Sequence, residues 1–383
     1  MNRSKPKIMA PVNSLEGASR VIPAGADEVY CGVALPTKYR SFILYRGPGK
    51  SSAQLPSYSE LEKIVKYAHD EGVKVIVVVN EPFMSDKLEK EMKNHVASIV
   101  EKEVDGLIIG DIGVLSIVKE MDVDVQLIAS TYFVSMNSET VEFLRSLGFS
   151  RVVLERHLTL DEISEIVKNS KVDIEVFCYY GGCSNINGNC YLYHFGTTKF
   201  WKASSELKTG SPGGRVRPAL TPCRFLYDIY DVNTKSYLGR WPIMDAFTIC
   251  SLCHLPALIR TGVAGLKIVG RFLDVLKQET ATRVIRTLVD KIWSEGGRLK
   301  RKSFHKLLSE LKRDLNYAFG PLSLIRQEAS KERRRIQLET SRLKNLHRFY
   351  QDTFCKPQRC FFAPLLNAPY KYEPSIVKSR VRS

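Results

Sequence analysis

The chain has 383 residues, of which 44% are apolar, and it carries a formal net charge of +16. A barrel of about 250 residues with an appendage fits this length better than two equal domains. The sequence contains no run of about 18 apolar residues and no apolar core near its start, so we expect neither membrane insertion nor secretion. We therefore expect a cytoplasmic protein whose nine cysteines are not in disulfides, and of which four could serve as thiolate ligands of a cluster.

Short apolar runs alternate with segments of helical periodicity along residues 1–295, which is typical of a parallel sheet covered by helices. Eight of these units favour closure into an eight-stranded parallel α/β barrel of the TIM type. The predicted strands are 7–12, 28–33, 74–80, 106–110, 125–130, 151–155, 173–180 and 265–270. Helices are predicted at 57–72, 85–102, 138–148, 159–170 and 272–295.

The predicted organisation is a barrel over residues 1–295, with a cysteine-bearing insertion at 191–264, and a basic helical extension at 296–383. A long insertion after a barrel strand is usually functional, because barrel enzymes build their sites at the carboxyl ends of the strands. Within the extension, segments 296–320 and 331–354 have helical periodicity.

The positive charge is concentrated in this extension. Residues 298–383 contain 21 Lys and Arg against 7 Asp and Glu, so the rest of the chain is nearly neutral. The basic residues recur on successive helical turns and are interleaved with Phe304, Tyr317, Phe349 and Tyr350. We expect this surface to bind the phosphates of tRNA or ribosomal RNA. A solvated helical cap is the alternative, and a paralogous protein subunit is a further partner that a basic surface could bind.

Four cysteines on or after the seventh predicted strand are candidate ligands. Cys183 and Cys190 stand in the pattern Cys-x4-Gly-x-Cys, in which Gly188 permits a turn that brings the two sulfurs together. Cys223 and Cys250 follow in the insertion. Four converging thiolates can hold a 4Fe-4S cluster, and they can equally hold zinc, since spacing alone does not decide between the two.

Two further readings of these cysteines remain open. Cys253 lies three residues past Cys250 and could replace it as a ligand. The cysteines could also be buried without binding any metal, although Cys183 and Cys190 lie among polar residues and glycines, which disfavours this.

The arrangement Glu-x-Phe-x5-Cys-x4-Gly-x-Cys, from Glu175 to Cys190, resembles the signature of the collagenase-like peptidase family U-32. The resemblance extends over most of the barrel, including residues 25–30, 154–163 and 254–271. Members were first classed as peptidases, yet the family includes oxygen-independent hydroxylases with a 4Fe-4S cluster. These act on quinone precursors or on bases of tRNA and ribosomal RNA. The resemblance implies prephenate as the oxygen donor.

The chain departs from the family pattern at five positions. His157 and Val269 each stand where the family usually has a glutamate, and Tyr179 and Tyr180 stand where it has a histidine and a glycine. Ala219 replaces the first cysteine of a Cys-x3-Cys pair, of which only Cys223 remains. These changes imply that acid/base roles are redirected or lost, and they leave the third cluster ligand open.

Three side chains at the ends of predicted strands are candidate catalytic residues. Arg156 and Arg271 carry planar guanidinium groups that can bind a dicarboxylate donor, although each could instead form a structural salt bridge. His157 could transfer protons, although a lone histidine is often only a hydrogen-bonding surface residue.

The sequence therefore predicts a 4Fe-4S-dependent, oxygen-independent hydroxylase acting on an RNA base or on a small aromatic substrate. The first alternative is a collagenase-like peptidase, for which we find neither a Gly-x-Ser-x-Gly nor a His-Glu-x-x-His motif. The second alternative is a non-catalytic protein for RNA binding or assembly.

Overall fold

The computed structural model describes residues 4–34, 53–80, 86–180, 186–189, 227–231, 233–241, 250–297, 299–319 and 334–338. The chain forms two compact units. The first contains Met1–Pro222 and Phe247–Leu299, and the second contains Cys223–Ala246 and Lys300–Ser383.

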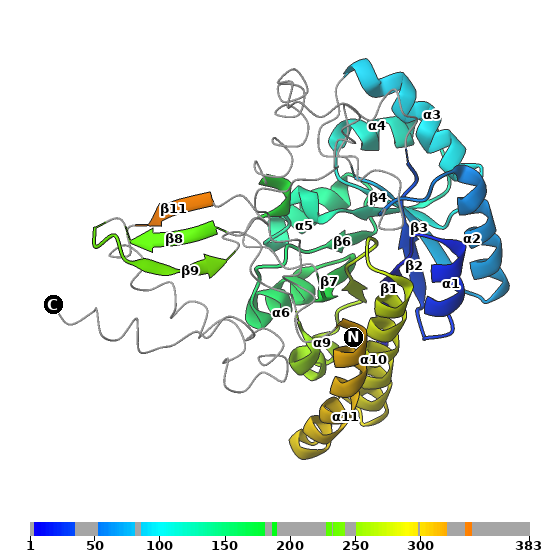
Figure 1. The fold of residues 1–383 in the computed structure, drawn as a ribbon. Coiled ribbons are helices and arrows are strands. Elements are labelled where there is room, and N and C mark those ends of the chain that lie inside the picture. Colours follow the sequence, from blue (N-terminus) through cyan, green and yellow to red (C-terminus); the bar gives the residue numbers. More distant parts are fainter. Residues whose placement is uncertain are drawn as a thin grey trace, which may run out of the picture. The chain divides into compact units, whose positions relative to one another are not determined.

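Eight parallel strands close into a barrel in the first unit (Figure 1). Their order around the barrel is β1-β10-β7-β6-β5-β4-β3-β2, which closes where β1 pairs with both β2 and β10. Every predicted strand is present, and the predicted fold class is confirmed. The strands are β1 (Lys7–Pro11), β2 (Glu28–Cys31), β3 (Lys74–Val79), β4 (Gly106–Ile109), β5 (Gln126–Ala129), β6 (Arg151–Val153), β7 (Asp173–Tyr179) and β10 (Gly265–Ile268).

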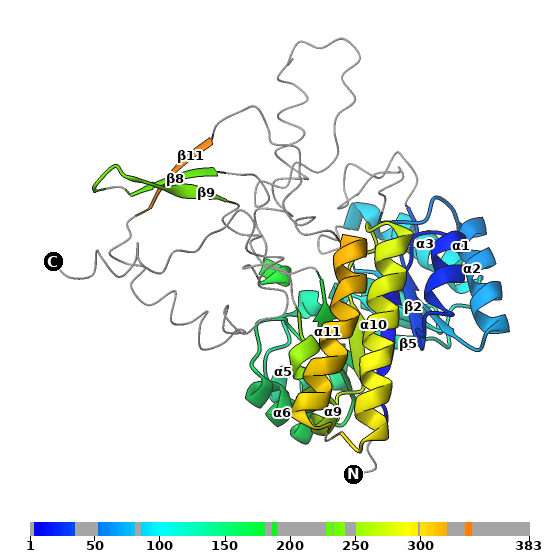
Figure 2. The ribbon, with the colours of Figure 1, turned by 60° about the horizontal axis from the view of Figure 1, so that its bottom comes forward.

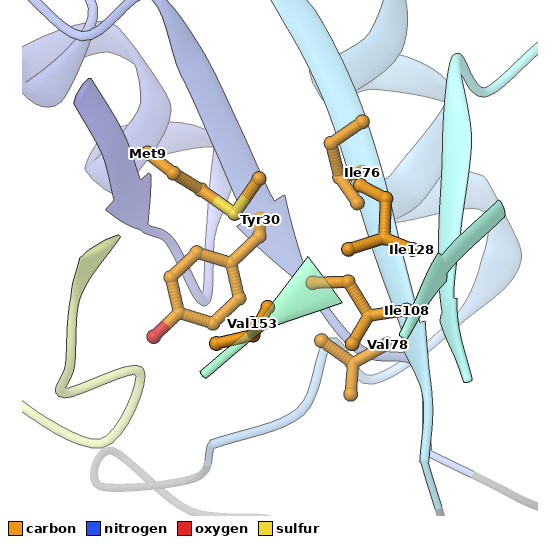
Figure 3. Close-up of a cluster of buried hydrophobic side chains, with 7 residues drawn as sticks. All are labelled: Met9, Tyr30, Ile76, Val78, Ile108, Ile128 and Val153. Carbon is orange, nitrogen blue, oxygen red and sulfur yellow. The ribbon is translucent and has the colours of Figure 1, made fainter. Parts of the chain in front are cut away.

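The barrel interior is filled by side chains. Strands buried on both faces need continuous apolar sequence, and β3, with the sequence KVIVVV, is buried from its second residue onward. Alternate residues of neighbouring strands point inward and meet in one apolar cluster (Figure 3). Because this core is packed, a site must lie at one end of the barrel and not within it. The cluster contains Met9, Tyr30, Ile76, Val78, Ile108, Ile128 and Val153.

Helices follow the strands and lie outside the barrel (Figures 1 and 2). The five helices predicted for the barrel correspond to α2, α3, α5, α6 and α10, whereas the short helices α1, α4 and α9 were not predicted. Several of these helices begin at a side chain that accepts a hydrogen bond from a backbone N–H of the first turn. At the start of α6, the Thr159 side chain accepts from the N–H of Glu162, and the Glu162 side chain accepts from the N–H of Thr159. The helices are α1 (Leu15–Val21), α2 (Tyr58–Asp70), α3 (Glu89–Val100), α4 (Ile112–Glu120), α5 (Ser138–Ser146), α6 (Leu160–Asn169), α9 (Leu255–Thr261) and α10 (Val275–Ser294).

The second unit combines a helix with a small sheet. Helix α11 (Arg301–Phe319) confirms a helix in the basic extension. Strands β8 (Tyr227–Asp231) and β9 (Tyr237–Trp241) form an antiparallel hairpin, and β11 (Arg334–Leu338) pairs in parallel with β8. A strand therefore occurs at residues 334–338, where we expected a helix. In the part of the chain that the structure describes, no helix is long and apolar enough to cross a bilayer.

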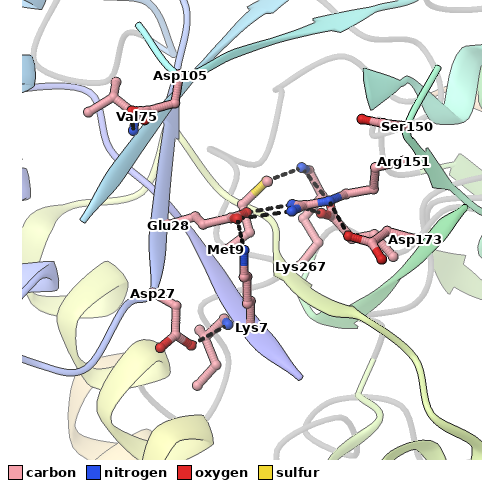
Figure 4. A network of polar contacts seen from close by, with 12 residues as sticks. Lys7, Met9, Asp27, Glu28, Val75, Asp105, Ser150, Arg151, Asp173 and Lys267 are labelled. Atoms are coloured by element: carbon pink, nitrogen blue, oxygen red, sulfur yellow. Dashed lines mark hydrogen bonds and ion pairs between the residues drawn. The ribbon is translucent and has the colours of Figure 1, made fainter. Parts of the chain in front are cut away.

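Buried charges form a network near the amino-terminal ends of the barrel strands (Figure 4). Arg151 donates to Oε1 of Glu28 at 2.9 Å and to Oε2 of Glu175 at 3.2 Å. Nζ of Lys267 donates to Oε1 of Glu175 at 2.8 Å and lies 4.2 Å from the ring centroid of Tyr30. Burial by itself would raise the pKa of Glu28, but the bond and charge of Arg151 hold it below its usual value. These compensating charges belong to the end of the barrel that governs stability.

Candidate functional site

The three predicted catalytic residues lie at the carboxyl ends of barrel strands. Arg156 and His157 follow β6, and Arg271 follows β10. In a parallel barrel these ends share one face, where barrel enzymes carry their sites. The structure thus brings the three side chains to one end of the barrel, which we call the mouth.

Arg156 is held against an aromatic ring. Its guanidinium carbon lies 5.1 Å from the ring centroid of Phe177, which packs against the apolar cluster of the barrel. A cation over an aromatic face is attracted by the ring quadrupole, so Phe177 restricts where the arginine can point. Arg156 therefore presents its charge from a fixed position beside β7.

Arg271 is positioned by neutral neighbours. Its Nη1 donates to Oε1 of Gln54 at 3.0 Å, and its guanidinium carbon lies 5.9 Å from the ring of Tyr30. Among the described residues, the side-chain hydrogen-bond partner of Arg271 is an amide and not a carboxylate.

Close to Arg271, burial raises the pKa of the Cys31 thiol to about 12, against the opposing charge of Arg271. Cys31 is therefore a protonated core thiol and not a reactive one.

His157 is bonded to a carboxylate that we did not single out from the sequence. Nδ1 of His157 lies 3.0 Å from Oε1 of Glu155, whose side chain is fully buried. Glu155 also accepts from Oγ1 of Thr131 at 2.8 Å and from the backbone N–H of Arg156 at 2.9 Å. Burial would raise the pKa of Glu155, but the bond from His157 and the charge of Arg156 lower it below the usual value.

Residues 181–190, which carry Cys183 and Cys190 and which we call the cysteine segment, contact the mouth through their described part. The 3-10 helix η4 (Asn187–Asn189) lies between the predicted ligands Cys183 and Cys190. The backbone N–H of Asn187 approaches Oε1 of Glu155 at 3.4 Å. A β-carbon built on Gly188 would lie 2.2 Å from the carbonyl oxygen of Tyr132, so only glycine permits this contact.

Cys250 lies beside the end of β7. It forms an isolated antiparallel bridge with Tyr179, the last residue of that strand, and the next N–H, of Ser251, donates to the carbonyl of Cys178 at 2.8 Å. Cys250 is half-buried, and Cys253 lies in the short helix η7 (Leu252–His254). Cys183, Cys190 and Cys223 lie outside the described residues, as does Ala219. Within the described residues, no group of three or more metal-ligating side chains gathers.

The donor chemistry of the predicted ligand set suits a cluster. Four thiols are what a 4Fe-4S cluster requires. In the sequence, Cys183 follows the last residue of β7 by four positions, and Cys250 forms its bridge with that last residue. The residues therefore fit such a group, while the ligand assignment stays a prediction.

Two of the positions that depart from the family pattern, Tyr179 and Val269, are joined by a backbone hydrogen bond. The Tyr179 side chain is buried, and burial raises the pKa of its hydroxyl well above the usual value. The backbone N–H of Val269 donates to the carbonyl of Tyr179 at 2.9 Å. Tyr180, the residue after Tyr179 in the chain, has a φ of 66°, an uncommon conformation for a residue with a side chain. This strained backbone marks the point where the chain leaves β7 for the cysteine segment.

Residues 13–328 match the model of Peptidase family U32, and the chain belongs to this family. Three curated relatives illustrate its range. The 23S rRNA 5-hydroxycytidine C2501 synthase of Escherichia coli is 28% identical over 78% of this chain and 41% of its own length. The tRNA hydroxylation protein P of Haemophilus influenzae is 26% identical over 63% of this chain and 52% of its own. The collagenase of Porphyromonas gingivalis is 29% identical over 50% of this chain and 46% of its own.

This chain thus spans about half the length of these relatives or less. The family predicted from the sequence is confirmed, and it contains proteins named for RNA hydroxylation as well as a collagenase.

Proposed function

We propose that the chain is an oxygen-independent hydroxylase that acts on an RNA base and uses a 4Fe-4S cluster held by Cys183, Cys190, Cys223 and Cys250. Two relatives named for RNA hydroxylation support the reaction. The observation that carries the cofactor proposal is the bridge between Cys250 and Tyr179. It fixes one proposed ligand at the strand end from which the cysteine segment begins.

The residues at the mouth would bind and orient the reactants. A bound cluster supplies redox or Lewis-acid chemistry at this face. Arg156 and Arg271 are suited to bind the carboxylates of an oxygen donor such as prephenate, because guanidinium groups bind carboxylates through paired hydrogen bonds. Among the described residues, Arg271 is bonded to an amide and therefore keeps its positive charge uncompensated by a bonded carboxylate. His157 is the candidate for proton transfer.

Helix α11 supports RNA as the substrate class. Lys302, Lys306, Arg313 and Tyr317 follow one another at spacings of four and seven residues, which places them on one stripe of the helix. All four are exposed, and Tyr317 keeps 82% of its surface accessible. Basic side chains with an exposed aromatic ring are suited to phosphates and an unstacked base. A small quinone precursor would not require this stripe.

The cofactor proposal is tested by purifying the protein without oxygen and measuring iron, acid-labile sulfide and visible absorption. We expect about four irons and four sulfides per chain. The Cys250→Ser variant should lose the cluster, while Cys253→Ser is the matched control and should keep it. Stoichiometric zinc without sulfide would contradict the proposal. Loss of the cluster in Cys253→Ser, but not in Cys250→Ser, would show that Cys253 and not Cys250 is the fourth ligand.

A peptidase is the second candidate, favoured by the likeness to the collagenase of Porphyromonas gingivalis. Cleavage of gelatin by the pure protein decides between the two functions. Cleavage that persists after removal of iron and is abolished in His157→Gln would support the peptidase. Absence of cleavage by protein that carries the cluster would support the hydroxylase.

A further inference from the structure

Glu155 joins three separate segments at the mouth of the barrel. Its carboxylate accepts from Thr131 in the 3-10 helix η3 (Thr131–Phe133), from the backbone and side chain that follow β6, and from Asn187 in the cysteine segment. The backbone of Glu155 is fixed as well, because its N–H donates to the carbonyl of Ser135 at 3.1 Å. A carboxylate with no exposed surface and this many donors is costly to bury unless each bond is made.

The bond to His157 has a definite direction. An ionised carboxylate can only accept hydrogen bonds, so Nδ1 of His157 must carry the proton in the pair. The low pKa of Glu155 agrees with an ionised group. Proton exchange between this histidine and a substrate would then proceed through Nε2. A partner that holds one ring nitrogen fixes both the tautomer and the orientation of the ring.

The cysteine segment is fastened by the same residue. Oε1 of Glu155 faces both Nδ1 of His157 and the N–H of Asn187, while Gly188 lies against the carbonyl of Tyr132. These contacts tie Asn187 and Gly188 to η3 and to the residue pair that follows β6.

We propose that Glu155 is a positioning residue, which sets the Nδ1–H tautomer of His157 and fastens the cysteine segment at the mouth of the barrel. This inference rests on the proposed function, since it assigns a geometry to the histidine and to the segment that carries two of the proposed ligands. Glu155 acts through these groups and not on the substrate directly.

The first test is nuclear magnetic resonance of the histidine side chains in full-length, metal-free protein. Long-range proton–nitrogen spectra at about pH 8.5, where an ordinary imidazole is neutral, distinguish the two tautomers. The His157 signal is assigned by its loss in His157→Gln. We expect the Nδ1–H tautomer in the wild type, and the Nε2–H tautomer there would overturn the inference without any reliance on a variant of Glu155.

The second test is amide exchange at Asn187 in Glu155→Gln, because glutamine keeps the size but replaces one acceptor oxygen with a donor. Exchange should be about tenfold faster than in the wild type, as expected for the loss of one hydrogen bond. The matched control is Glu165→Gln, an exposed carboxylate on α6, which should exchange at the wild-type rate. Equal rates in all three proteins would overturn the role of Glu155 in the cysteine segment.

Both readouts use metal-free protein and require no substrate. A wild type that never binds a cluster would contradict the proposed function while the tautomer and exchange results still support Glu155. Conversely, a wild type that binds the cluster would support the proposed function, while an unchanged exchange rate in metal-free Glu155→Gln would contradict this inference.

Discussion

At the mouth of the barrel, the guanidinium group of Arg271 lies directly against the α-carbon of Gly32, in the space that a side chain at this position would occupy. A β-carbon built on residue 32 would lie 2.5 Å from Nη1 of Arg271 and 2.0 Å from Oε1 of Gln54, both well inside van der Waals contact. The position of the guanidinium therefore depends on the absence of a side chain at residue 32. The requirement is for space and not for an unusual backbone, since Gly32 is not among the residues with positive φ.

Gly32→Ala should consequently displace Arg271 from Gln54. A shift of about 1 Å in a group that positions a reactant can lower a rate by about 100-fold. We expect a loss of this order in RNA hydroxylation with little change in the melting temperature. The control is Gly72→Asn, because no atom lies within 4 Å of a β-carbon at residue 72 and asparagine tolerates its positive φ. Equal activity in the two variants would contradict a role for Arg271 that depends on Gly32.

The buried charge network should dominate the stability of the barrel. Arg151→Met leaves Glu28 and Glu175 without the guanidinium that both accept from. Removing one partner of a buried pair costs about 3–5 kcal/mol in the free energy of unfolding, which urea titration can measure. Arg145→Met breaks an exposed pair with Glu142 and should change stability little. Similar losses in both variants would show that burial of the network does not matter.

His95 should make stability depend on pH. Burial lowers the pKa of His95 to about 4, and its Nδ1 lies 2.7 Å from the hydroxyl of Tyr58. The folded pKa is below the unfolded one, so the neutral form stabilises the fold above about pH 6.5. That contribution falls as the pH drops from about 6.5 to 4, by on the order of 3 kcal/mol in total.

His95→Gln should remove this component of the pH dependence of unfolding. The control, Asn94→Gln, changes an exposed residue of the same helix that carries no titratable group and should keep the wild-type slope. A wild-type stability that stays constant between about pH 6.5 and 4 would contradict the burial of a neutral His95.

The basic stripe of α11 should set the salt dependence of RNA binding. Replacing Lys302, Lys306 and Arg313 by glutamine should reduce the slope of log K against log salt by roughly 0.7 for each lost phosphate contact, or about 2 in total. Filter binding with bulk tRNA between low and moderate salt measures this slope. Glu310→Gln changes an exposed acidic residue of the same helix and should not flatten the slope. A triple variant with the wild-type slope would remove the argument for RNA as the partner of this helix.

The barrel could be predicted from the sequence because its strands are short runs of apolar residues with clear turn signals. β3, with KVIVVV, has that form, and the long helix α10 has an unbroken helical period. The seven-residue helices α1 and α9 were missed because one or two turns give too little periodicity to recognise. Strand β11 was missed because its basic sequence, RRIQL, lies inside a segment with helical spacing.

The candidate site was predictable only in part. Strand-end positions pointed to Arg156, His157 and Arg271, and the structure has all three at the mouth. Glu155 escaped notice, because its partners Thr131 and Asn187 are 24 and 32 residues away in sequence. Nothing in the local sequence distinguishes a carboxylate that organises a site from one on the surface.

The most direct measurement is mass spectrometry of nucleosides from tRNA and ribosomal RNA of cells that lack this protein. The account predicts that one nucleoside carrying an extra oxygen disappears, returns with the wild-type chain, and stays absent with Cys250→Ser. Nucleosides that are identical in cells with and without the protein would contradict the assignment of an RNA hydroxylase.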